Sequence, residues 1–314
     1  MNSMKKIITS ILVMALILGL AACGGSKTPA APTYTSDELY EKYLNDEITA
    51  TIDCNDFYGA DYGDVKTISE LVYGEGDELG EYFLNNVYYG YIDCGMDGED
   101  ELLVAAEFIT PGDTDYIEEQ FIVKAFGQDL KVLSMDTSGA RYMTAITDTG
   151  YIYYEGSGGA SSFYTEHSYM NAEGRRVFLY SAQFEYELSG AIIPDSFLPS
   201  GVQNESAWDY QEDGYEVDVY NFNYLGPEYD DRWDDYLRES YFVFYSPDGE
   251  NIMPEEPEKS IYETYKIKAV TEDDLYTELY KHLEDLGVTE ELVDGEPADL
   301  ELMDSEAVEW LPKG

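Results

Sequence analysis

The stretch from residue 88 to residue 187 repeats one pattern, a short run rich in Tyr, Ile, Val and Phe followed by a turn sequence. β-Branched and aromatic side chains favour strands, whereas Gly, Pro, Asn and Asp favour the turns between them. We therefore predict eight strands, at residues 88–92, 101–108, 120–126, 130–134, 142–147, 151–155, 162–170 and 177–187. Such spacing indicates an antiparallel body, and three arrangements fit it: a curled sheet, a sandwich or a propeller-like array.

The rest of the chain adds strands and helices to this body. Further strands are expected at residues 215–224, 241–245, 260–270 and around 300–310. Helices are expected from Ser36 onward and at residues 67–73, 79–84, 227–239 and 274–286, with a break at 74–77 and a punctuated loop at 191–214. The predicted fold class is mainly β (α+β), an antiparallel β-rich body flanked by N-terminal and C-terminal helices.

The amino terminus has the features of a lipoprotein signal peptide. Two lysines precede an apolar run at residues 7–20, which is too short and too early for a spanning helix. Leu20, Ala21, Ala22 and Cys23 then match a bacterial lipobox, so we predict cleavage after residue 22 and lipidation of Cys23. Residues 23–35 form the lipidated cysteine and a flexible tether, residues 36–190 a helix plus a β-rich domain, and residues 191–314 complete the same body.

Composition excludes some partners. The net charge is −49, with 66 acidic and 17 basic residues, so the chain lacks the basic surface that nucleic acids require. Anionic lipid would repel it as well, which leaves the lipid at Cys23 as the expected membrane attachment. The 31 tyrosines suit half-buried strands, and they also suit surfaces that bind sugars or proteins. We favour the strand interpretation.

An acidic loop lies between the first two predicted strands. Asp93, Asp97 and Glu101 could each supply a carboxylate, and Glu99 a backbone carbonyl, to a Ca²⁺ ion. Gly95 stands where a further ligand is expected, so a site here would be weak, with a dissociation constant of about 10⁻⁴–10⁻³ M. The alternative is a hydrated acidic turn without metal.

The segment YIDCGMDGEDELLVA resembles the D-x-N-x-D-G-x-x-E-L segment of uncharacterised surface lipoproteins of clostridial (Firmicutes) bacteria, and it is more distantly similar to the calcium loops of FG-GAP-type β repeats. Residues 40–48, YEKYLNDEI, resemble the helix that precedes the loop in those lipoproteins, and Trp310 resembles their late tryptophan. The resemblance implies an architecture and a bacterial surface location, and it implies no activity. Gly95 departs from the pattern.

After lipidation of Cys23, two cysteines remain. Cys54 and Cys94 each follow Ile-Asp, and in a secreted chain they are candidates for a disulfide. The alternative is two thiols, with Cys94 directed into the core.

No catalytic motif stands out in the sequence. His282 lies near the end of the last predicted helix, where a histidine is structurally favoured. His167 has Glu166 and Ser168 beside it, but neighbours in a strand point to opposite faces, so the three cannot form a triad. We therefore expect a non-enzymatic, extracellular, lipid-anchored binding module for a glycan or protein partner. A glycan-degrading enzyme with a carboxylate pair is the alternative.

Overall fold

The computed structural model describes residues 33–54, 62–78, 82–110, 116–157, 162–185, 216–223, 240–245, 249–253 and 268–312. The signal peptide, Cys23 and most of the tether lie outside these residues, as do the expected loop at 191–214, the expected helix at 227–239 and most of the expected strand at 260–270. Residues Ser36–Gly314 form one compact unit. Within the described part of the chain, no helix is both long and apolar enough to cross a membrane.

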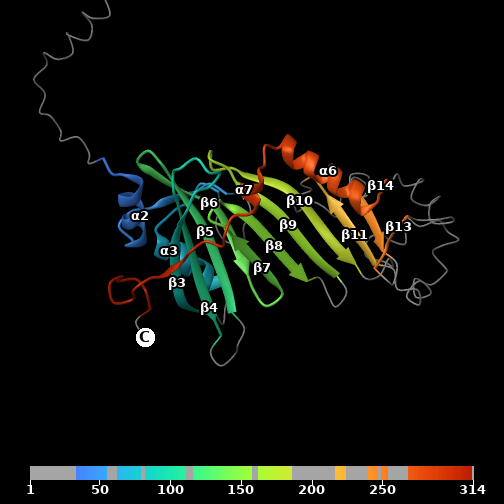
Figure 1. The fold of residues 1–314 in the computed structure, drawn as a ribbon. Helices are drawn as coiled ribbons and strands as arrows, with labels where there is room; N and C mark the ends of the chain where they lie inside the picture. The colour runs from blue at the N-terminus through green and yellow to red at the C-terminus, as the bar shows by residue number, and fades with distance from the viewer. Residues whose placement is uncertain are drawn as a thin grey trace, which may run out of the picture. The chain divides into compact units, whose positions relative to one another are not determined.

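The predicted mainly β class is confirmed, because two largely antiparallel sheets make up the body (Figure 1). The first sheet has the strand order β15 (Glu301–Leu302), β3 (Phe83–Ile92), β4 (Glu101–Ile109), β5 (Tyr116–Phe126), β6 (Asp129–Ser138), β1 (Ala50–Ile52) and β2 (Val65–Lys66). The second has the order β13 (Asn251–Ile252), β12 (Tyr241–Tyr245), β11 (Glu216–Asn221), β10 (Arg176–Glu185), β9 (Ser162–Met170), β8 (Tyr151–Ser157) and β7 (Tyr142–Ile146). The short β14 (Lys268–Ala269) also pairs with β12.

Each sheet is built around an antiparallel meander, which runs from β3 to β6 in the first sheet and from β7 to β12 in the second. The eight strands predicted between residues 88 and 187 are all present, most of them longer than expected. β1 pairs in parallel with β6, and β14 in parallel with β12. These parallel pairs are very short and join residues far apart in the sequence, so no local pattern announces them.

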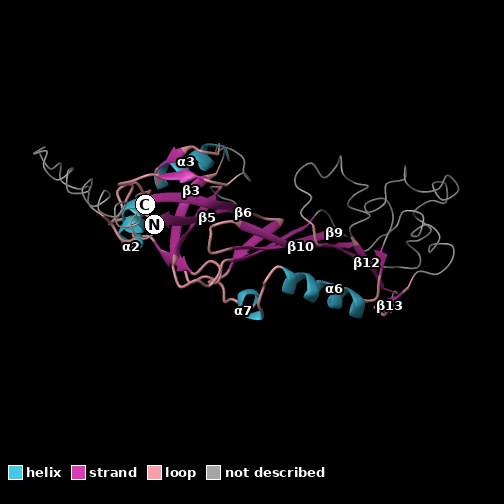
Figure 2. Ribbon diagram, turned by 90° about the horizontal axis from the view of Figure 1, so that it is seen from above, coloured by secondary structure: helices cyan, strands magenta, loops and turns pink. Residues whose placement is uncertain are grey.

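Two helices pack on the first sheet, as Figure 2 shows for α2 (Ser36–Leu44) and α3 (Ile68–Glu78). The expected apolar side chains of α2 are all buried; they are Leu39, Tyr40, Tyr43 and Leu44. The Tyr40 hydroxyl donates to the Asp100 carbonyl at 3.0 Å and accepts from the Ala125 amide at 3.0 Å, which fixes the helix over the sheet.

The predicted break at residues 74–77 is wrong, because α3 continues to Glu78. Thr67 and Glu70 form a capping box, with hydrogen bonds of 3.3 and 2.9 Å in the two directions. Ile68, Leu71 and Val72 are fully buried, and this burial offsets the cost of about 1 kcal/mol for a glycine in a helix. The helix expected at residues 79–84 is also wrong for its last two residues, because Phe83 and Leu84 belong to β3 and pair with β4.

The C-terminal residues connect the two sheets. α6 (Glu272–Asp285) begins at the predicted N-cap Thr271, whose hydroxyl accepts from the Asp274 amide at 3.2 Å, and it packs against β12. After α7 (Glu290–Val293), the Ala298 amide donates to the Ile146 carbonyl of the second sheet, and β15 pairs with β3 of the first. The indole of Trp310 then donates to the Leu44 carbonyl at 2.9 Å.

A shared core lies where the sheets meet. It is lined by buried side chains from β3, β4, β5 and β6 together with side chains from β7, β8 and β9. Its members are Ile92, Cys94, Leu103, Ile122, Leu133, Ile146, Ile152 and Met170. Burial of these side chains from both sheets stabilises their packing into one unit.

Candidate functional site

The acidic loop between β3 and β4 uses its carboxylates to hold its own backbone. Both carboxylate oxygens of Asp93 accept from the Gly98 amide at 3.1 Å, and Asp97 Oδ1 accepts from the Glu99 amide at 2.8 Å. Gly98 has a φ of 80°, a conformation that favours glycine. These contacts are those of a tight polar turn.

Glu101 leaves this turn and points into the protein. Its side chain is fully buried, and its carboxylate accepts from the Cys94 amide at 2.8 Å and from the Lys124 ammonium. Leu102 pairs with Val123 in the register of β4 and β5, which brings the adjacent residues Glu101 and Lys124 together, and Lys124 Nζ is also 4.0 Å from Asp97 Oδ2. An ammonium group thus supplies positive charge to two of the four predicted calcium ligands.

Burial and pairing act in opposite directions on this ion pair. Burial raises the pKa of Glu101, although Lys124 and the Cys94 amide oppose that rise. Burial disfavours the charged form of Lys124, but Glu101 and Asp97 outweigh it and hold the lysine pKa above its usual value. Around neutral pH the Lys124 ammonium therefore keeps its positive charge.

The predicted ligands Asp93, Asp97, Glu99 and Glu101 are not arranged around one point. Among the described residues, no group of three or more His, Cys, Asp or Glu side chains is placed to hold a metal ion. Calcium binding at this loop stays a prediction, and Lys124 is the residue that competes with it.

The cysteine pair is present as two thiols rather than the disulfide that the sequence allowed. Cys54 follows β1 and Cys94 follows β3, and β4, β5 and β6 lie between those strands in the sheet. Four strand spacings amount to about 19 Å, far beyond the roughly 7 Å between Cα atoms that a disulfide can bridge. Cys94 is fully buried, and burial together with Glu101 raises the pKa of its thiol, so it is unreactive.

The two histidines both pack on aromatic rings. His282 Nε2 lies 2.8 Å from the Leu179 carbonyl and its ring stacks on Phe222 at 5.0 Å, which supports the expected structural role. His167 lies against Tyr180, with ring centroids 4.1 Å apart and planes 13° apart, and its Nδ1 is 2.6 Å from the Tyr151 hydroxyl. Burial lowers the pKa of His167 to about 4, so its ring is uncharged at neutral pH.

Glu166 and Ser168 lie on the opposite face of β9, as the alternation of a strand requires. Ser168 accepts from Arg176 Nε at 3.0 Å, and Glu166 lies 3.8 Å from the same guanidinium. Arg176 also donates to Asp136 of β6 at 2.7 Å, so this face carries a structural contact between the two sheets. His167 therefore has no nucleophile or carboxylate from its own strand beside it.

His167 belongs to a continuous row of rings across β8, β9, β10 and β11. We define the aromatic face by its five members: Tyr153, His167, Tyr180, Tyr220 and Phe184. Successive centroids lie 5.0, 4.1, 6.4 and 6.3 Å apart. Cross-strand pairing places Tyr153 beside His167 and His167 beside Tyr180, so the row follows from the register of the sheet.

The aromatic face forms the floor of a hollow with a volume of about 330 Å³. Thr165, Ala182, Glu155 and Phe163 complete its lining, and the small side chains of Thr165 and Ala182 create the depression between the rings. Tyr276 and Tyr280 of α6 lie close enough to influence the pKa of Tyr180, which burial raises to about 12. The hydroxyl of Tyr180 thus stays protonated, and it is hydrogen-bonded to Tyr151.

Part of this site could be predicted from the sequence. Alternation in YIYYEGS and SFYTEHSYM places Tyr153, Glu155, Phe163, Thr165 and His167 on common faces of two neighbouring strands. The addition of Tyr180, Phe184 and Tyr220 depends on the register of β10 and β11, which the sequence does not give.

No protein-family model matches the chain, and neither a curated protein nor a solved structure matches it.

Proposed function

We propose that the chain is a lipid-anchored bacterial surface protein that binds a glycan on its aromatic face. The lipobox ending at Cys23 and the resemblance to clostridial surface lipoproteins support the location. The observation that carries the binding role is the row of five neighbouring rings, with His167 stacked on Tyr180, at the floor of an open hollow of about 330 Å³.

Sugar rings present apolar C–H faces and a rim of hydroxyl groups. The ring faces of an aromatic floor match the first, and phenol hydroxyls and a carboxylate at its edge match the second. The face offers both, because Tyr153 and Tyr180 carry hydroxyls and Glu155 lies at the exposed margin.

The charge state of the aromatic face favours uncharged sugar rings as its ligands. His167 is neutral at pH 7, and the phenols Tyr180 and Tyr220 are protonated because burial raises their pKa values. A net charge of −49 would repel a polyanionic chain.

A glycan-degrading enzyme receives less support. Glycosidases use two carboxyl groups about 5–10 Å apart. Of the described residues that line the hollow, Glu155 alone carries a carboxylate, and it accepts from the Tyr153 hydroxyl at 2.6 Å. We therefore expect no release of reducing ends from polysaccharides during long incubation.

The test is affinity electrophoresis of the full-length protein in detergent against soluble xylan, β-glucan, galactomannan and starch. Tyr180→Ala and Phe184→Ala each remove part of the floor, and we expect a loss of about 1–2 kcal/mol, or roughly five- to thirtyfold in affinity. Tyr116→Ala is the matched control, because Tyr116 is an exposed tyrosine of the other sheet. Absence of retardation by every polysaccharide, or equal retardation of all four proteins, would refute the proposal and leave a protein partner as the alternative.

A further inference from the structure

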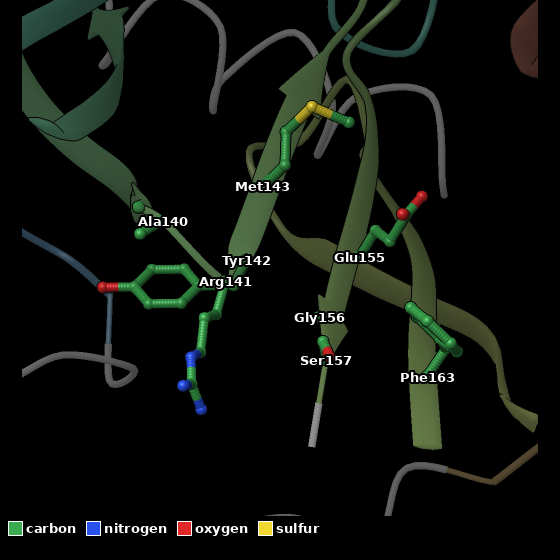
Figure 3. Close-up of a pocket in the computed structure, with 9 residues that line it drawn as sticks. Ala140, Arg141, Tyr142, Met143, Glu155, Gly156, Ser157 and Phe163 are labelled. Carbon is green, nitrogen blue, oxygen red and sulfur yellow. The ribbon is translucent and has the colours of Figure 1, made fainter. Parts of the chain in front are cut away.

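A second hollow, of about 560 Å³, is lined by the residues drawn in Figure 3. It adjoins the first hollow, because Glu155 and Phe163 line both. Arg141 comes from the turn before β7, Met143 from β7, and Ser157 from β8. These side chains and the aromatic face lie on one side of the sheet, because Met143 pairs with Glu155 and Ser157 pairs with Phe163. The two hollows are therefore neighbouring parts of one surface.

Arg141 is the one arginine of the described residues that forms no ion pair. Arg175 and Arg176 both pair with carboxylates, as do Lys42, Lys124 and Lys131. Lys66, Lys268 and Lys281 also lack an ion pair with a described residue, but only Arg141 lines a hollow. Its guanidinium is exposed in the hollow, with its five N–H donors available to a ligand.

The distance between Arg141 and the aromatic face sets the length of a ligand that can contact both. Its carbonyl accepts from the Ser157 amide at 2.9 Å, and Ser157, Phe163 and Phe184 follow one another across β8, β9 and β10. Three strand spacings separate Arg141 from Phe184, or about 14 Å. A short oligosaccharide can therefore rest on the aromatic face and reach the guanidinium with one end.

We propose that Arg141 binds a carboxylate carried by the glycan, so that the ligand is an oligosaccharide of uncharged rings bearing one acidic sugar. This inference rests on the proposed glycan function and specifies the ligand class. Arg is suited to a carboxylate because its planar donors can bind both oxygens. Glu155 lies nearby on the same side of the sheet and limits the site to a single, well-placed anionic group.

The experiment measures affinities for matched pairs of probes by isothermal titration calorimetry. The pairs are lactose with 3′-sialyllactose, and xylotriose with xylotriose carrying one glucuronic acid. The wild-type protein should bind the acidic member of a pair about fivefold more tightly, and the preference should shrink as salt is raised. Arg141→Gln should abolish the preference without changing affinity for the neutral member.

Glu155→Gln supplies a test with the opposite sign. It keeps an acceptor for the Tyr153 hydroxyl and removes a negative charge, so affinity for the acidic member should rise. Equal affinity for both members, or a preference that survives Arg141→Gln, would overturn this inference. The proposed glycan binding would still stand in that case if Phe184→Ala weakens the binding of both probes. Absence of binding by every probe would overturn the inference and the proposed function together.

Discussion

The His167 imidazole offers a test of the aromatic face that needs no ligand. The groups around its ring are the phenols of Tyr151, Tyr153 and Tyr180, and burial against them lowers the histidine pKa to about 4. In the unfolded chain the ordinary pKa is about 6.5. Between these values the unfolded state binds more protons than the folded state, so His167 contributes stability that is complete above pH 6.5 and is lost as pH falls through about 4.

The size of the effect follows from the difference between the two pKa values. Each pKa unit corresponds to about 1.4 kcal/mol, so lowering the pH from 7 to 4.5 removes about 2–3 kcal/mol of unfolding free energy through this one group. Urea unfolding at both pH values measures that loss in the wild-type protein and in His167→Gln. Other groups titrate over the same range, but they do so in both proteins, and the difference between the two losses isolates His167.

The expected result is that His167→Gln is less stable than wild type at pH 7 and loses about 2–3 kcal/mol less on acidification. Glutamine keeps a polar planar group beside the Tyr151 hydroxyl and cannot take up a proton. Equal losses in the two proteins would mean that the imidazole is hydrated and charged at low pH in the folded state, and the packed aromatic face would then be incorrect.

Two further substitutions test the core beneath the acidic loop. Lys124→Met leaves the buried Glu101 without its partner and should lower the free energy of unfolding by about 3–5 kcal/mol; adding Glu101→Gln should recover much of this, and millimolar Ca²⁺ should raise the melting temperature of Lys124→Met more than that of wild type. Gly150→Ala places a Cβ 2.8 Å from Cys94 Sγ at a residue with a φ of 77°, and should cost about 2–4 kcal/mol in chemical denaturation. A melting temperature unchanged by either substitution would contradict the packing around Cys94 and Glu101.

The long strands were predictable because their signal is local. The alternation of Tyr, Ile and Val between turn sequences is repeated along residues 88–187, and β9 and β12 have the predicted bounds. β1 and β2 were not predicted, because they contain three and two residues and exist only through pairing with distant segments. The break expected at Gly74 failed because tertiary burial of α3 outweighs intrinsic propensity.

The candidate sites were harder to predict than the fold because they depend on register. Glu101 was assigned to a calcium loop from its spacing to Asp93 and Asp97, but the pairing of β4 with β5 places Lys124 against it. Nothing near Glu101 in the sequence indicates a lysine 23 residues away. His167 likewise acquires its stacking partner Tyr180 from the neighbouring strand.

The most direct measurement of the central claim is chemical footprinting of tyrosine side chains on the full-length protein, with and without the polysaccharide that retards it most. Hydroxyl-radical labelling read by mass spectrometry reports each tyrosine separately. Glycan binding on the aromatic face predicts protection of Tyr153, Tyr180 and Tyr220, with unchanged labelling of the exposed Tyr116. Protection of Tyr116 with the three face tyrosines unchanged would contradict the account and move the binding surface to the other sheet.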